Sequence, residues 1–182
     1  AEGVAGEVGR DVGRTFPRIP LFASSTAKGA QGRAVLYAVL LEFVRLCPDV
    51  GYCQGVNFVA AALMALDSAP DGAGAMRLRR RTPAAVTWLL VALARRFSMA
   101  DLWGPDLPRL HVITYQLSAL IKRHLPGLSA HLSAIGLGLE VLAAQWLIPL
   151  FSSLLPFRTL ARVYDVFFVD GWKAAFRVAL AL

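Results

Sequence analysis

The chain has 182 residues, of which 57% are hydrophobic and 17% are charged, and its formal net charge is +7. This length suffices for one domain with a substantial core, in one lobe or two. The uncharged run 84–94 is too short to span a bilayer, and the run 141–157 is interrupted by prolines, serines and a glutamine. We therefore expect no transmembrane segment, and we interpret 141–157 as two buried helical pieces.

The two cysteines, Cys47 and Cys53, match no metal-binding or redox spacing. Reduced, mostly buried cysteines fit a reducing compartment. The Gly-rich, charged first residues lack the apolar core of a secretory signal. We therefore expect a cytoplasmic protein, and peripheral association with endomembranes stays open.

The first predicted helix runs from Glu7 to Phe16 and is ended by Pro17. Asp11 and Arg14 are three positions apart and therefore neighbours on its surface. A positive charge suits the last turn of a helix. The simplest interpretation of the two residues is a surface ion pair of little energetic worth. Prolines, glycines and a Ser-Ser-Thr cluster predict a loop over residues 17–32.

Two further helices are predicted on either side of a polar turn. Apolar residues at helical spacing mark the first, which Pro48 ends: Leu36, Val39, Leu40, Phe43, Val44 and Cys47. A similar stripe marks the second: Val56, Val59, Ala60, Leu63 and Met64. The turn 49–57 places Gln54 near a helix N-terminus, where free N–H groups favour anions. Because a buried amide needs partners, Gln54 either caps this helix or serves a function.

Residues 67–82 are predicted to be an exposed loop with an arginine-rich run from Arg77 to Arg81. The favoured interpretation of the run is a solvated loop, because it lacks the interleaved aromatic residues of a nucleic-acid surface. We expect no nucleic-acid partner, while attraction to acidic lipid or to an acidic protein face stays open. Thr82 and Pro83 predict an N-cap and a first-turn proline for the next helix.

The rest of the chain also has helical periodicity. Stripes continue from Val86 to Phe97 and over about 110–125, where Pro126-Gly127 is expected to end the helix. Short helices follow over 128–155, then a helix around 160–168 and a final stripe from Trp172. No convincing period-2 strand and no internal repeat is found. The predicted class is all-α, with about nine or ten helices and no β-sheet.

Most catalytic signatures are absent from the sequence. There is no GxxxxGK[ST] loop, no GxGxxG and no GxSxG elbow. The histidines at positions 111, 124 and 131 share no helix face with carboxylates, so no metal site is expected. Cys53 has no obvious base and is not expected to act as a nucleophile.

Arg14 and Gln54 together suit the hydrolysis of GTP held by another protein. The planar fork of an arginine can bridge two phosphate oxygens and neutralise their charge. A glutamine amide both donates and accepts hydrogen bonds, so it can orient the attacking water. The partner would then hold the nucleotide, which fits the lack of a nucleotide-binding loop here.

The sequence also resembles the TBC domain of GTPase-activating proteins for Rab-type small GTPases. The first motif of that family, I-x-x-D-x-x-R, reads VGRDVGR over 8–14 and is followed by Thr-Phe-Pro. The second, Y-x-Q-G, reads YCQG over 52–55, with Asn57 also in place. Later landmarks are YQL at 115–117, LPGL at 125–128, AQW at 144–146 and RVYD at 162–165. The resemblance covers nearly the whole chain.

The resemblance implies a GTPase activator for membrane trafficking that has no nucleotide site or cofactor of its own. Arg14 would be an arginine finger and Gln54 a glutamine finger, inserted in trans toward the GTP and Mg of a GTP-bound Rab. Asp11 would orient Arg14 or brace its loop. The turn that carries Gln54 would be shaped by Tyr52, Gly55 and Asn57.

The chain departs from the family pattern in several places. Val8 replaces the usual isoleucine, Tyr164 stands where tryptophan is common, and the acidic and aromatic run after the second motif is missing. The family's upstream Arg-and-Trp helix is absent and the last stripe is cut off, so a domain incomplete at both ends is expected. Two alternatives stay open: a catalytically silent module that binds a small GTPase or another trafficking protein, and a membrane-associated helical scaffold.

Overall fold

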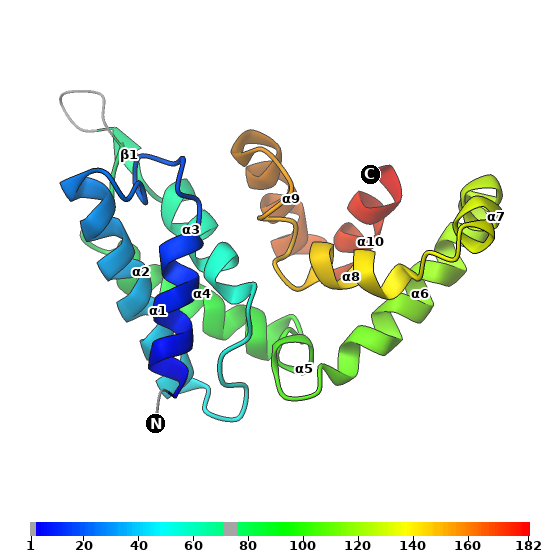
Figure 1. The fold of residues 1–182 in the computed structure, drawn as a ribbon, viewed down its shortest axis with the longest axis horizontal. Coiled ribbons are helices and arrows are strands. Elements are labelled where there is room, and N and C mark those ends of the chain that lie inside the picture. Colours follow the sequence, from blue (N-terminus) through cyan, green and yellow to red (C-terminus); the bar gives the residue numbers. More distant parts are fainter. Residues whose placement is uncertain (1–2, 71–75) are drawn as a thin grey trace. The chain divides into compact units, whose positions relative to one another are not determined.

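The computed structural model describes residues 3–70 and 76–182 (Figure 1). These residues form ten α-helices and one pair of two-residue strands. The predicted all-α class is confirmed. The chain divides into two compact units, one up to Gly104 and one from Pro105 to Leu182.

The first unit is built around one long helix. Its helices are α1 (Val4–Arg14), α2 (Ala27–Leu46), α3 (Val56–Leu66), α4 (Thr82–Arg96) and α5 (Ala100–Trp103). Helix α2 packs against α1, α3 and α4, and α5 packs against α4. The predicted stripe of α2 supplies much of the core, where Phe43 meets Trp103 edge to face at 6.0 Å. The core therefore fixes α1 and α3 through their shared contact with α2.

Helix α2 begins earlier than the sequence predicts. The loop expected over 17–32 is wrong beyond Thr26, whose Oγ1 accepts a hydrogen bond from the Gly29 N–H at 3.0 Å and caps the helix. A Cβ on Gly29 would collide with the Ala23 carbonyl oxygen, and one on Gly32 with that of Leu21. The two glycines therefore allow α2 to lie directly against the preceding segment, although they look like loop residues in the sequence.

The predicted loop 67–82 is largely non-helical where it is described, and residues 71–75 of it lie outside the described part. Strands β1 (Ala69–Pro70) and β2 (Met76–Arg77) pair antiparallel there, a local exception to the absence of a sheet. The predicted cap at Thr82 is wrong, because α4 begins at Thr82 itself and no side chain caps it. The Thr82 hydroxyl instead donates to the Asp67 carboxylate at 2.8 Å and so links the two ends of the loop.

The second unit contains α6 (Pro108–His124), α7 (Pro126–Ala134), α8 (Leu139–Leu147), α9 (Phe157–Asp170) and α10 (Trp172–Ala181). Helix α6 packs against α7, α8 and α10, and α9 packs against α10. Pro126 not only ends α6 but also occupies the first turn of α7.

The run 141–157 contains only one of the two helical pieces predicted for it. Helix α8 ends at Leu147 and the residues that follow form turns, in which Leu150 and Phe151 adopt φ values of 46° and 61°. Both side chains are nonetheless fully buried, as predicted. The prolines at 149 and 156 limit helix formation on either side of this turn.

Within the described residues, no single helix is both long and apolar enough to cross a bilayer. Helices α7 and α8 are long and apolar enough only when taken together, and the chain bends by 115° between them.

Replacing Gly32 with alanine is expected to lower the free energy of unfolding by about 2–3 kcal/mol, because the added methyl meets backbone that cannot move aside. Gly13→Ala in α1 is the matched control, since nothing lies within 4 Å of a Cβ there. The control should gain about 0.5–1 kcal/mol from helix propensity. Urea denaturation of both variants checks this, and equal stability of the two would contradict the tight contact.

Candidate functional site

The end of α1 carries an ion pair with one buried member. Val8 and Val12 are buried and orient the helix so that Asp11 also lies on its inner side. The Asp11 side chain is 6% exposed and that of Arg14 is 55% exposed. Arg14 donates from Nε and Nη2 to Asp11 Oδ1, at 2.9 and 2.6 Å. The predicted pair is present, but it is not a surface pair, because its carboxylate is almost entirely removed from water.

The second oxygen of Asp11 links α1 to the turn before α3. The Tyr52 hydroxyl donates to Asp11 Oδ2 at 2.7 Å. Burial, with the neighbouring Asp11 carboxylate, raises the pKa of Tyr52 above its usual value, so the phenol stays a donor. The carboxylate therefore binds Arg14 with one oxygen and Tyr52 with the other.

A second chain of hydrogen bonds runs beside the first. The Thr15 hydroxyl donates to the Asp11 backbone carbonyl at 2.6 Å and accepts from Asn57 Nδ2 at 2.8 Å. Asn57 Oδ1 accepts from the Gly55 N–H at 2.9 Å. Asn57 is fully buried and Thr15 is 1% exposed, so this link is shielded from water. It fixes the end of α1 against the first turn of α3.

The turn between α2 and α3 is held at further points. Asp49 forms an ion pair with Arg95 near the end of α4, and this guanidinium lowers the pKa of Asp49. The Phe16 ring, just after α1, meets the Phe58 ring of α3 at 5.2 Å. Gly51 and Gly55 have φ values of 70° and 118°, a region that side chains disfavour. These contacts and the two glycines therefore fix the conformation of the turn.

Gln54 differs from its neighbours because its amide is exposed. It makes no side-chain hydrogen bond to any other described residue. The N-cap of α3 is Gly55, without a side-chain cap, so the interpretation of Gln54 as a helix cap is wrong. The structure thus joins Asp11, Arg14, Tyr52, Gly55 and Asn57 in one network, with Gln54 on the same turn beside it.

Thr15 also belongs to this network, although its place in the sequence predicts no role for it. Its only sequence signal is its position directly after Arg14. A threonine following a helix is common, and only the buried contact with Asn57 distinguishes this one.

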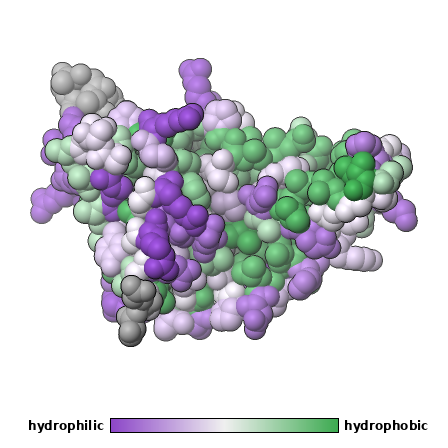
Figure 2. Space-filling view, viewed as in Figure 1, coloured by the Kyte–Doolittle hydropathy of each residue, from purple (hydrophilic) through white to green (hydrophobic). Residues whose placement is uncertain are grey.

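Hydrophilic residues cover the outward side of α1 (Figure 2), where Glu7, Arg10 and Arg14 are exposed. Arg14 therefore lies at the end of a polar, accessible face rather than in a closed cavity. A site of this kind can act on a group brought by a partner molecule.

Burial, with the charges of Glu7 and Asp11, raises the pKa of Cys53 to about 11. A thiol with this pKa is protonated at neutral pH and is a weak nucleophile. No group of three or more His, Cys, Asp or Glu among the described residues could hold a metal ion.

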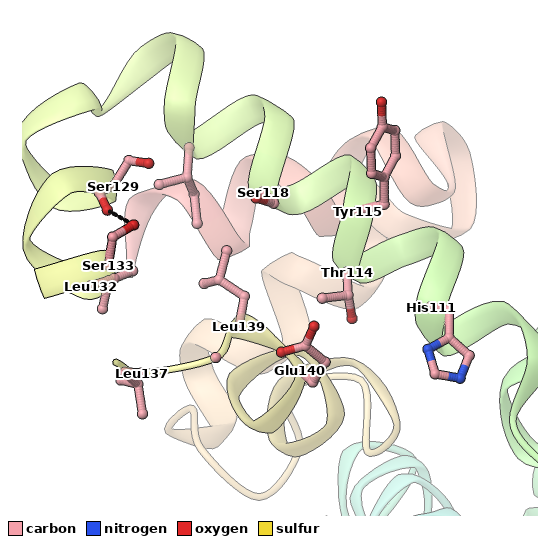
Figure 3. A pocket seen from close by; sticks show the side chains of 12 residues that line it. His111, Thr114, Tyr115, Ser118, Ser129, Leu132, Ser133, Leu137, Leu139 and Glu140 are labelled. Carbon is pink, nitrogen blue, oxygen red and sulfur yellow. Dashed lines mark hydrogen bonds between the residues drawn. The ribbon is translucent and has the colours of Figure 1, made fainter. Parts of the chain in front are cut away.

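A hollow of about 380 Å³ lies in the second unit between α6, α7 and the start of α8 (Figure 3). Hydroxyl groups line it, together with His111 and the Glu140 carboxylate. It contains none of the predicted site residues. Its carboxylate makes it a poor place for a phosphate.

The sequence model of the Rab-GTPase-TBC domain matches residues 4–182. Among curated proteins, the chain is 31% identical over 173 residues to Rab GTPase-activating protein tbc-11 of Caenorhabditis elegans, covering 95% of this chain and 17% of the relative. It is 33% identical over 175 residues to growth hormone-regulated TBC protein 1 of Xenopus laevis, covering 96% of this chain and 46% of the relative.

Among solved structures, a Chlamydomonas flagellar RabGAP TBC domain matches with a TM-score of 0.76 and 30% identity. The match covers 100% of this chain and 54% of that one. The chain thus spans about half or less of the length of these relatives.

Replacing Asn57 with alanine should lower the free energy of unfolding by about 2–3 kcal/mol, because it leaves the Gly55 N–H without its partner in a buried site. Gln54→Ala, which removes an exposed amide, should change it by less than about 0.5 kcal/mol. Urea denaturation of the two variants gives the comparison. Comparable losses would mean that Gln54 has a structural role after all.

Cys53 should react slowly with iodoacetamide at pH 8 while the protein is folded. A thiol whose pKa is raised to about 11 holds far less thiolate at this pH than an ordinary one, so alkylation should be about a hundredfold slower. Peptide mapping by mass spectrometry measures the rate at Cys53, with urea-unfolded protein as the control. A folded rate equal to the unfolded rate would contradict the shift.

Proposed function

The chain belongs to the Rab-GTPase-TBC domain family, and from this premise we propose that it accelerates GTP hydrolysis by a Rab-type small GTPase. The partner, in its GTP-bound form, would hold the nucleotide and its Mg. This chain would supply Arg14 and Gln54 in trans. The names of two similar proteins, a Rab GTPase-activating protein and a RabGAP TBC domain, support the same assignment.

The observation that carries the proposal is the shared carboxylate of Asp11. It orients the Arg14 guanidinium through Nε and Nη2, and Nη1 has no hydrogen bond to any described residue. A donor that is already oriented loses little freedom when it meets the charge that develops in a transition state. Asp11 is therefore a positioning residue for Arg14, and Tyr52 positions Asp11 in turn.

Gln54 supports the proposal because its exposed side chain neither caps α3 nor hydrogen-bonds to another described residue. An exposed amide with no internal partner can use both its carbonyl and its N–H₂ on a water molecule. The backbone beside it is fixed through Gly55 and Asn57, so the side chain projects from a defined point. These are the properties expected of a group that orients an attacking water.

In the proposed reaction, water attacks the γ-phosphorus of GTP while the bond to the β–γ bridging oxygen breaks, giving GDP and phosphate. Gln54 would orient the water and accept a hydrogen bond from it. Arg14 would neutralise the charge that builds up on the phosphate oxygens. Arginine fingers in other GTPase systems accelerate hydrolysis by about 10³–10⁵.

The test is single-turnover GTP hydrolysis across a panel of Rab-type GTPases. The wild-type chain should accelerate at least one, and Arg14→Ala and Gln54→Ala should each lose about a hundredfold or more of that acceleration. Arg10→Ala is the matched control, because Arg10 is an exposed arginine on the same helix without a partner among the described residues.

Three outcomes separate the alternatives. Full activity of Arg14→Ala would overturn the arginine-finger assignment, and full activity of Gln54→Ala would overturn the role of the amide. Binding of a GTPase without acceleration by the wild type would instead identify a silent binding module. The unfolding free energy of each variant is measured alongside, so that loss of fold is not mistaken for loss of catalysis.

A further inference from the structure

A second polar site lies in the first unit, between the start of α2 and the segment that leads into α4. It is a cavity of about 290 Å³. Four cations line it: Lys28, Arg77, Arg79 and Arg80. Leu21, Val35, Leu78 and Pro83 add apolar surface, and no carboxylate is among the described lining residues. Among the described residues, the charged side chains of the lining are therefore all cationic.

Three arginines gather at this cavity, unlike the arginines of the chain that pair with carboxylates. Arg14, Arg45 and Arg95 each pair with a carboxylate. The side chains of residues 77, 79 and 80 are exposed, and none makes an ion pair or hydrogen bond to a described residue. Guanidinium groups match the oxygens of a phosphate in pairs. The chemistry that complements this cavity is a phosphate group with more than one negative charge.

An exposed tryptophan lies next to the cavity. Trp88 is 63% exposed on α4 and lines an adjoining groove of about 340 Å³, and Pro83 lines both hollows. The groove's one carboxylate, Glu42, is already paired with Arg45 at 2.6 Å. Tryptophan favours the interface between water and lipid, where its ring is half buried and its N–H stays hydrated. An anionic lipid surface accounts for both the arginines and the indole, and the experiment below separates it from an acidic protein face.

We propose that this surface, formed by Arg77, Arg79, Arg80 and Trp88, docks on an anionic membrane and takes a phospholipid headgroup into the cationic cavity. The phosphate would bind the arginines, and the indole would enter the headgroup region beside it. The inference is independent of the proposed GTPase reaction, because it uses none of the residues of the Arg14 and Gln54 site.

The experiment is co-sedimentation of the chain with lipid vesicles. Vesicles of phosphatidylcholine alone should bind weakly, and vesicles that also contain phosphatidylserine or phosphatidylinositol bisphosphate should bind more tightly, less so at high salt. Each cation near such a surface contributes about fivefold in affinity, so Arg79→Gln with Arg80→Gln should weaken binding about 25-fold. Trp88→Ala should also weaken it.

Matched controls remove the same charge or aromatic area elsewhere. Arg123→Gln with Arg158→Gln removes two exposed arginines that have no partner among the described residues, and Tyr115→Ala removes an aromatic ring that is 77% exposed. Both should bind nearly as well as the wild type. An equal loss in the arginine control would overturn the proposal, since net charge alone would then explain binding.

Other results would also overturn it. Binding to soluble inositol hexakisphosphate without binding to vesicles would mean that the cavity takes a free phosphate compound. Binding to polyglutamate but not to vesicles would indicate an acidic protein partner. The acceleration of GTP hydrolysis in solution is measured on the same variants, and Arg79→Gln with Arg80→Gln should retain it. Failure of the lipid proposal would then appear only in vesicle binding, and failure of the GTPase proposal only in hydrolysis.

Discussion

The buried carboxylate of Asp11 is the interaction on which the candidate site depends. A charge removed from water is costly unless it is paired and hydrogen-bonded. Asp11 meets this requirement with Arg14 on its own helix and Tyr52, which is 41 positions further along the chain. Because Arg14 balances the charge and Tyr52 satisfies the second carboxylate oxygen, the end of α1 and the turn before α3 are linked through one buried group.

The second link, from Thr15 to Asn57, explains why the site divides into fixed and accessible residues. The buried polar groups at 11, 15 and 57 satisfy one another and the local backbone. Gln54 and much of Arg14 are left exposed at the edge of that network. A catalytic group needs a rigid base and an open face, and the network provides the first without occupying the second.

The sequence predicted much of this arrangement because its signals are local. The spacing of Asp11 and Arg14 on one helix, the Gly-framed turn and the apolar stripes each depend on near neighbours. The errors arose where tertiary contact decides the outcome. Gly29 predicts a loop but belongs to α2, where the lack of a side chain lets the Ala23 backbone approach. Thr82 donates a hydrogen bond to Asp67 and does not cap α4. Gln54 does not cap α3, which has no side-chain cap. Such contacts leave no periodic trace in a sequence.

Two groups of arginines in the first unit have different surroundings, which a net charge of +7 does not distinguish. Arg14 and Arg95 pair with Asp11 and Asp49 and so help to hold the turn that carries Gln54. The arginines at 77, 79 and 80 make no ion pair or hydrogen bond to a described residue. This second group lines one cavity, where the proposal above places a phosphate group from outside the chain. If both proposals hold, a membrane that carries both this surface and the partner GTPase would raise the concentration at which the two encounter each other.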